Sequence, residues 1–93
     1  MIGDTASRVC PIVNRLGLHA RAATKLVQLA SKFDSEVQLS KDGMIVNAKS
    51  VMGVLMLVAS RGTEVTVHAR GPDAETAVEA IARLVASRFG EES

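Results

Sequence analysis

The sequence contains very few aromatic residues. It has no tryptophan and no tyrosine, and its two phenylalanines are Phe33 and Phe89. Domains that bind single-stranded nucleic acid stack the bases on exposed aromatic side chains. They also carry strong positive charge, whereas the formal net charge here is +1. Nucleic acid is therefore not an expected partner.

Cysteine and long apolar runs are also scarce. Cys10 is the only cysteine, so no internal disulfide and no cysteine-based zinc site can form. The longest apolar run covers residues 51–59 and is interrupted by Gly53, whereas a membrane span needs roughly 20 residues. The first residues lack the basic and apolar pattern of a secretion signal. We expect a cytoplasmic protein with no metal, no cofactor and no inserted membrane segment.

The length of the chain sets its organisation. Its 93 residues suffice for one domain with a small core. We expect a single domain over residues 1–93, with a loose start at 1–7 and an acidic tail at 90–93, and we expect it to be monomeric.

Apolar periodicity predicts alternating helices and strands. The apolar residues recur with period two in four segments and with helical period in three. In chain order these are a strand at 8–13, a helix at 20–31, strands at 36–40 and 44–48, a helix at 51–58, a strand at 63–70 and a helix from 74 to about 89. The order β-α-β-β-α-β-α favours an α+β fold in which helices cover one face of a single sheet.

Turn and cap residues separate these elements. Asp42-Gly43 predicts a tight hairpin, because both residue types tolerate positive φ. Ser50 and Asp73 are expected N-caps, and Gly62 and Gly90 are expected to end the helices that precede them.

The most informative residue is His19. Gly17 predicts a turn, and an alanine-rich helix begins just after the histidine. The first amides of a helix have no internal partner and lie at the positive end of its dipole, so they bind anions. Arg21 adds a guanidinium suited to phosphate. This combination indicates a histidine that carries a phosphoryl group; the alternative is a solvated histidine at an ordinary helix start.

The chemistry expected at this site needs position and charge rather than elaborate catalysis. A positive helix end favours the neutral imidazole, which is the nucleophile. After transfer, the phosphoryl oxygens would meet the amides of Ala20 and Arg21. The sequence alone does not choose between the two ring nitrogens.

The helix predicted at 51–58 is apolar on nearly all sides. A short surface helix needs to bury only one stripe, so the excess predicts an exposed docking patch, for which methionine is well suited. The alternative is a helix that is buried as a whole. Ser50 has a structural role as the cap of this helix, worth about 1 kcal/mol.

Several other polar residues have simpler interpretations. His68 is expected on the surface of its strand, since no glycine turn or helix start accompanies it. Lys49 and Arg70 are expected to be solvated charges. Cys10 is expected to pack against the sheet, without a redox role.

Two segments resemble the signatures of the HPr family, the histidine phosphocarriers of the bacterial phosphoenolpyruvate-dependent phosphotransferase system. They are NRLGLHAR at 14–21 and AKSVMGVLML at 48–57, and the resemblance extends from about residue 7 to 89. It implies an open-faced sandwich, with a four-stranded antiparallel sheet and three helices on one side.

The resemblance also implies partners and roles. Enzyme I would phosphorylate His19 on Nδ1 with the help of Arg21, and the phosphoryl group would pass to a histidine of an EIIA protein. Ser50 matches a serine that an ATP-dependent regulatory kinase modifies in many members. The candidate docking residues are Ala20, Met52, Gly53 and Leu55. Such a protein is a carrier and not an enzyme, because the phosphorylated form is an intermediate.

One departure and three alternatives accompany this resemblance. Many members have proline where this chain has Ala22, so the helix start is expected to be slightly less rigid here. The first alternative is a regulatory phosphocarrier of the nitrogen-related branch. The others are an interaction module that never passes phosphate on and an unrelated ferredoxin-like ligand-binding domain, since fold alone does not settle function.

Overall fold

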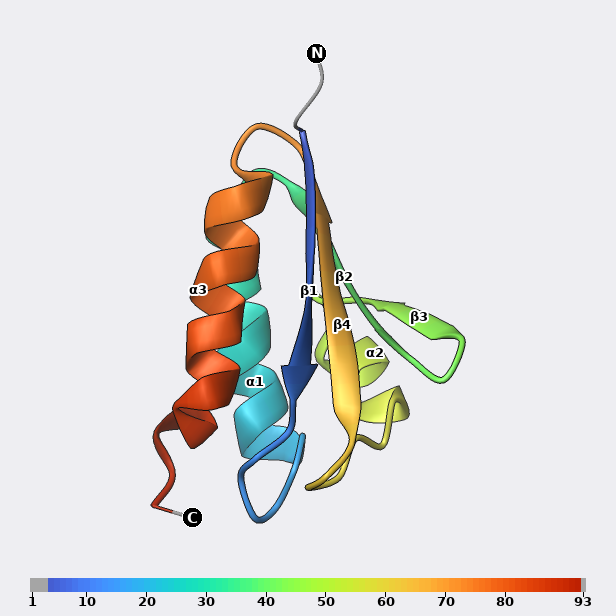
Figure 1. Cartoon of the computed structure of the whole chain (residues 1–93), viewed down its shortest axis with the longest axis vertical. Helices are drawn as coiled ribbons and strands as arrows, with labels where there is room; N and C mark the ends of the chain where they lie inside the picture. Colours follow the sequence, from blue (N-terminus) through green and yellow to red (C-terminus); the bar gives the residue numbers. More distant parts are fainter. Residues whose placement is uncertain (1–3, 93) are drawn as a thin grey trace.

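A computed structural model describes residues 4–92 and contains one antiparallel sheet with its helices on one side (Figure 1). Its elements follow the predicted order. They are β1 (Thr5–Pro11), α1 (Ala20–Ala30), β2 (Glu36–Lys41), β3 (Met44–Asn47), α2 (Val51–Met56), β4 (Glu64–Arg70), α3 (Ala74–Ala86) and a short 3-10 turn, η1 (Arg88–Gly90).

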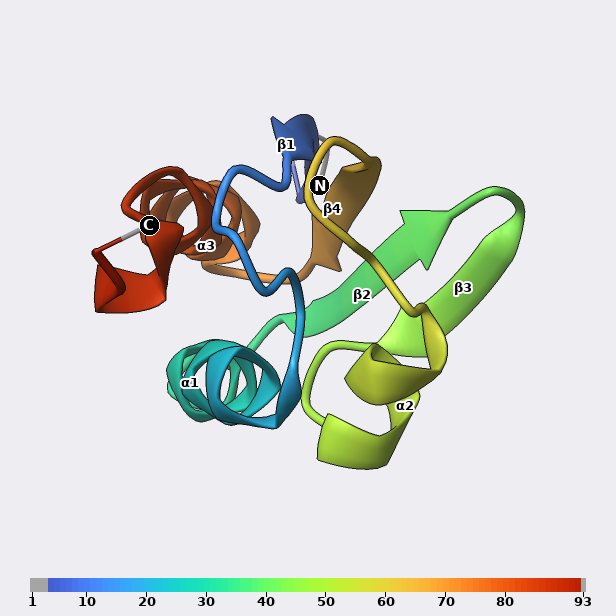
Figure 2. The same ribbon diagram turned by 90° about the horizontal axis from the view of Figure 1, so that it is seen from below.

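The four strands lie in the order β1-β4-β2-β3, and each neighbouring pair is antiparallel. The inner strand β4 pairs with β1 through Cys10 and Val65, and with the other inner strand, β2, through Leu39 and Val67. Seen from below, α1, α2 and α3 all lie on the same side of the sheet (Figure 2). The predicted open-faced sandwich is confirmed.

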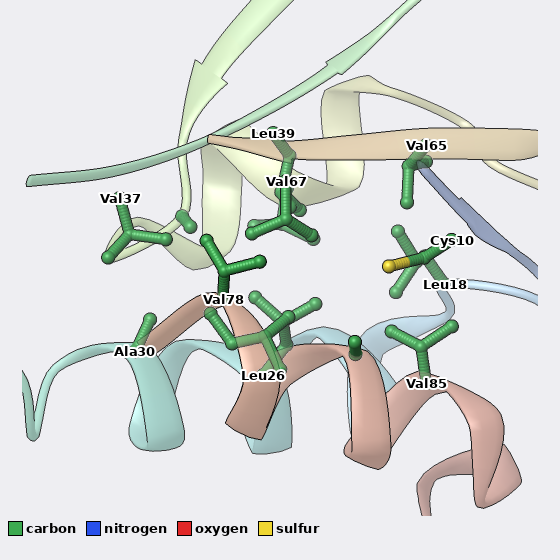
Figure 3. Packing of buried hydrophobic residues seen from close by; sticks show 14 of the residues in the cluster. Cys10, Leu18, Leu26, Ala30, Val37, Leu39, Val65, Val67, Val78 and Val85 are labelled. Atoms are coloured by element: carbon green, nitrogen blue, oxygen red, sulfur yellow. The ribbon is translucent and has the colours of Figure 1, made fainter. Parts of the chain in front are cut away.

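The core lies between the sheet and α1 and α3 (Figure 3). Alternation in β4 buries Val65 and Val67 on the helix side. Helical spacing in α1 buries Leu26 and Ala30 against them. Because the helices cover one face only, the other face of the sheet stays open.

The first strand begins and ends earlier than predicted, at Thr5 and Pro11 rather than at residues 8 and 13. It begins at Thr5, so residues 5–7 of the segment expected to be loose are paired with residues 68–70 of β4. The physical reason is that β4 offers a free edge along its whole length, which β1 covers. Residues 1–3 of the same segment lie outside the described residues. Pro11 ends this edge strand, where its missing N–H is tolerated.

Two helices end earlier than predicted. Helix α2 ends at Met56 and not at 58, because Val58 takes a positive φ of 48°; Gly62 belongs to the turn before β4. Helix α3 ends at Ala86, before Gly90, because Arg88 and Phe89 have positive φ. This turn lets the Phe89 side chain enter the core.

Asp73 lies at the N-cap position of α3, as predicted, but makes no side-chain capping bond. Its carboxylate instead accepts hydrogen bonds from the amides of Asp34 and Ser35, at 3.0 and 2.9 Å, and from the Ser35 hydroxyl. The predicted position of Asp73 is therefore right, but the expected hydrogen bond to its side chain from the first amides of α3 is absent. The carboxylate fastens the loop between α1 and β2 to the start of α3.

Across residues 4–92, every helix is too short or too polar to cross a bilayer.

Candidate functional site

The turn before α1 places His19. Gly17 has a φ of 66°, its amide bonds to the carbonyl of Asn14 at 3.2 Å, and the next amide, of Leu18, bonds to the carbonyl of Ala59 at 2.9 Å. His19 follows in an extended conformation and is the N-cap residue of α1. The sequence prediction that a glycine turn delivers His19 to a helix start is confirmed.

The two ring nitrogens of His19 have different partners. Nδ1 accepts a hydrogen bond from the backbone amide of Arg21 at 3.2 Å. Nε2 lies 2.5 Å from the Oε2 atom of Glu91. Since Nδ1 accepts and a carboxylate can only accept, these contacts assign the ring proton to Nε2 and the lone pair to Nδ1. The lone pair therefore faces the first amides of the helix.

Glu91 is held in place from a second side. The side-chain amide of the buried Asn14 donates to the Oε1 atom of Glu91 at 3.1 Å and to the carbonyl of Gly17 at 2.8 Å. Lys25 donates to the carbonyl of Phe89 at 2.6 Å, which ties the tail to α1. The hydrogen bond from His19 is the main reason that the pKa of Glu91 lies below its usual range, and the Asn14 bond acts in the same direction, whereas burial opposes both.

The tail contact is a functional feature that the sequence analysis missed. His19 and Glu91 are 72 residues apart in the chain. In the sequence Glu91 is only one of two acidic residues near the end, and no local pattern marks it. The sequence offered one general indication of this contact: a positive helix start at His19 attracts a carboxylate, but it does not say which one.

The site opens to solvent. The His19 side chain is 26% exposed and that of Glu91 16%. Arg21 lies on the exposed side of α1, as does Ala20. A shallow hollow at this end of the molecule is lined by Arg15, Leu16, His19, Arg21, Glu91 and Glu92. The structure thus brings the predicted pair of His19 and Arg21 to one surface hollow.

Helix α2 lies beside this helix start (Figure 2). The hydroxyl of Ser50 accepts the amide of Gly53 at 3.1 Å, so the predicted N-cap is confirmed. Val54 is buried, whereas Met52 is 74% exposed and Leu55 also reaches solvent. The alternative of a helix buried as a whole is therefore wrong, and an apolar surface adjoins the start of α1.

The remaining polar residues lie mostly where expected. His68 is exposed, with its Nε2 atom 3.2 Å from the Ser40 hydroxyl. Lys49 is not simply solvated, because it donates to the carbonyl of Phe33 at 2.8 Å. Arg70 is exposed and lies 3.5 Å from Glu36. Within residues 4–92, no three His, Cys, Asp or Glu side chains gather as a metal site would require.

Cys10 is buried on the helix side of the sheet, as the sequence analysis predicts. Burial raises the pKa of its thiol, and nearby Arg8 opposes this only in part. A thiol kept in its neutral form is unreactive, in agreement with a packing role.

Fold and site together define a small α+β domain whose surface presents a histidine at an anion-binding helix start. A family model described as "PTS HPr component phosphorylation site" matches residues 6–87. The chain belongs to the HPr family, the phosphocarriers of the phosphotransferase system. The family resemblance and the expected role as a carrier rather than an enzyme are thereby confirmed.

Similar proteins support the same assignment. The chain is 54% identical over 80 residues to the phosphocarrier protein HPr of Cupriavidus necator, covering 86% of this chain and 90% of that protein. It is 46% identical over 86 residues to the phosphocarrier protein NPr of Shewanella violacea, covering 92% and 94%. Both relatives are matched over nearly their whole length.

Solved structures agree with the fold. The crystal structure of HPr-C-His from Thermoanaerobacter tengcongensis is similar with a TM-score of 0.91 and 45% identity, covering 95% of this chain and 99% of that one. An HPr dimer from the same organism is similar with a TM-score of 0.75 and 49% identity, covering 86% and 92%.

Proposed function

We propose that this protein accepts a phosphoryl group from phosphorylated Enzyme I on Nδ1 of His19 and passes it to a histidine of an EIIA protein, in the cytoplasm and in the service of sugar uptake and its regulation. The observation that carries this proposal is the contact between Nδ1 and the amide of Arg21. It directs a lone pair of the ring toward the part of a helix that stabilises anions.

The transfer follows from this geometry. The Nδ1 lone pair forms a bond to phosphorus while the bond between phosphorus and the donor nitrogen breaks. Nδ1 then no longer accepts the Arg21 amide, so this amide is free to donate to a phosphoryl oxygen. The Ala20 amide, which has no partner within the helix, donates to another. The Arg21 guanidinium adds a charge-assisted contact.

Partner recognition would use the apolar surface beside the helix start. Ala20, Met52, Gly53 and Leu55 are the candidate docking residues, and the exposure of Met52 and Leu55 supports this assignment. Apolar area next to a reactive group allows several partners to dock in turn.

We expect the free protein to be a monomer, which size-exclusion chromatography with light scattering would test.

Ser50 is the proposed site of regulation by a serine-specific HPr kinase. Its hydroxyl precedes α2 and is partly exposed. A phosphate there would add negative charge beside Met52 and Gly53 and would repel an acidic partner. We expect Ser50→Asp to slow the phosphorylation of His19 by Enzyme I. Equal kinetics for Ser50→Asp and the unaltered protein would contradict this role.

A chase experiment tests the relay. The protein is labelled with phosphoenolpyruvate and Enzyme I, separated from both, and mixed with a sugar-type or a nitrogen-type EIIA. We expect the label to move to the sugar-type EIIA. Retention of the label with both acceptors would support an interaction module that does not pass phosphate on.

A regulatory role in the nitrogen-related branch is the second candidate. It is favoured by the 46% identity to a protein named NPr. The segment Ser50-Val51-Met52-Gly53 favours the general, kinase-regulated type. Faster transfer to the nitrogen-type EIIA in the chase would reverse this preference.

A further inference from the structure

We propose that Glu91 is a positioning residue for His19: its carboxylate holds the Nε2 proton, so that Nδ1 remains the nitrogen that receives the phosphoryl group. This inference rests on the proposed function and extends it to the C-terminal tail.

Further hydrogen bonds hold the contact between Glu91 and His19 in place. Glu91 uses both carboxylate oxygens, one toward Nε2 of His19 and one toward the side-chain amide of Asn14. Asn14 is fully buried and also holds the carbonyl of Gly17, which belongs to the turn that delivers His19. The same asparagine therefore fixes the turn before the histidine and the carboxylate behind it.

The backbone of the tail is fixed as well. Positive φ at Arg88 and Phe89 turns the chain back after α3, and the Phe89 side chain is buried. Lys25 of α1 holds the Phe89 carbonyl at 2.6 Å. These contacts bring Glu91 to the start of α1 from the opposite end of the sequence.

The electron balance of the transfer explains what the carboxylate does. The Nδ1 lone pair forms the new N–P bond, and the electron pair of the broken bond returns to the donor histidine of Enzyme I. Nε2 keeps its proton, so the ring gains positive charge as the new bond forms. An ionised carboxylate on that proton stabilises the charged ring. When the phosphoryl group leaves for an acceptor histidine, the ring becomes neutral again.

The position of the carboxylate avoids repulsion with the phosphoryl group. Nδ1 and Nε2 lie on different edges of the ring, and Nδ1 faces the Arg21 amide. Glu91 is ionised at neutral pH, because its pKa lies below the usual range through the hydrogen bond from His19. It therefore acts on the Nε2 edge of the ring and does not occupy the amides that face Nδ1.

The test compares Glu91→Gln with Glu79→Gln in the full-length chain. Both variants lose one negative charge, but Glu79 is exposed on α3 and makes no contact with His19 within the described part of the chain. We expect Glu91→Gln to lower kcat for phosphorylation by Enzyme I about 10-fold, with KM unchanged. We expect Glu79→Gln to match the unaltered protein.

A second measurement is independent of Enzyme I. In the free protein, nitrogen-15 NMR should detect a hydrogen-bonded Nε2 proton on His19 that exchanges slowly with water. We expect this signal in the unaltered protein and in Glu79→Gln, and its loss in Glu91→Ala. Circular dichroism controls for folding in each variant.

The outcomes separate this inference from the proposed function. If the unaltered protein is phosphorylated and Glu91→Gln has the same kcat as Glu79→Gln, the positioning role is overturned and the carrier function stands. A change in KM alone would assign Glu91 to partner contact and would also overturn the inference. If the unaltered protein takes no phosphoryl group from Enzyme I, the proposed function fails, and this inference fails with it.

Discussion

Gly17 packs its Cα directly against the carbonyl of Ala59. A Cβ atom at Gly17 would lie 2.5 Å from that oxygen and 2.9 Å from the Cα atom of Ser60. Both neighbours are backbone atoms of the segment between α2 and β4, so neither can rotate away. The turn that delivers His19 is thereby fixed against a distant part of the chain.

We therefore expect Gly17→Ala to be strongly destabilising. A left-handed residue with a Cβ costs about 1–2 kcal/mol by itself, and the backbone clash adds to this. Gly43→Ala is the matched control, because Gly43 also has a positive φ but a Cβ there would meet nothing within 4 Å. Urea denaturation should show the larger loss for Gly17→Ala; equal losses would mean that the contact with Ala59 adds nothing.

Stability is expected to depend on Asp73 at acid pH. Hydrogen bonds from the Ser35 hydroxyl and from the amides of Asp34 and Ser35 lower the pKa of Asp73, with the hydroxyl contributing most. A carboxyl with a lowered pKa stabilises the fold fully above its unfolded-state pKa of about 3.9, and this contribution is lost as the pH falls through the lowered value. The relevant window therefore lies below about pH 4.

The Asp73→Asn variant should be less stable than the unaltered protein at pH 7, and the difference should shrink as the pH falls through this window. Thermal unfolding followed at several pH values measures it. Asp42→Asn is the control, because the Asp42 side chain is 87% exposed on the hairpin. A difference for Asp73→Asn that stays constant from pH 7 to pH 2 would contradict the assigned hydrogen bonds.

Removal of the Ser50 hydroxyl should weaken α2. Ser50→Ala loses the bond to the Gly53 amide, and the loss of such a cap costs about 1 kcal/mol. In a domain of this size that corresponds to a fall in Tm of about 4–8 °C. Ser60→Ala is the control, since Ser60 is exposed and its structural bonds use the backbone carbonyl. Unchanged Tm values for both variants would argue against a capping role.

A charge on the exposed surface of α2 should weaken docking. Met52→Glu is expected to raise the KM for Enzyme I about 10-fold, which corresponds to about 1.4 kcal/mol, without altering thermal stability. Val9→Glu is the control, because Val9 is also exposed and alternates with the buried Cys10, which places it on the open face of the sheet. If both variants have the KM of the unaltered protein, partners do not use α2.

Most of the fold could be predicted because its signals are local. Asp42-Gly43 forms the hairpin, with positive φ at both residues. Ser50 caps α2, and alternation in β4 identifies its buried face. Each of these features depends on residues close together in the chain, where propensity and periodicity apply.

The wrong or missing predictions concern contacts between segments that are far apart in the chain. Asp73 has the sequence of an N-cap, but Ser35 of another loop takes its carboxylate. The start of β1 depends on the free edge of β4, where Thr5 pairs with Arg70, 65 residues further on. The contact between His19 and Glu91 depends on the turn after α3, and nothing near either residue indicates it. Tertiary packing decides such cases, and a single sequence does not display it.

The central claim is that His19, and not the second histidine, carries the phosphoryl group. Intact mass spectrometry after incubation with Enzyme I and phosphoenolpyruvate tests it with the unaltered protein, His19→Ala and His68→Ala. We predict an acid-labile, base-stable gain of about 80 Da in the unaltered protein and in His68→Ala, and no gain in His19→Ala with an unchanged circular dichroism spectrum. A gain retained in folded His19→Ala would contradict the account.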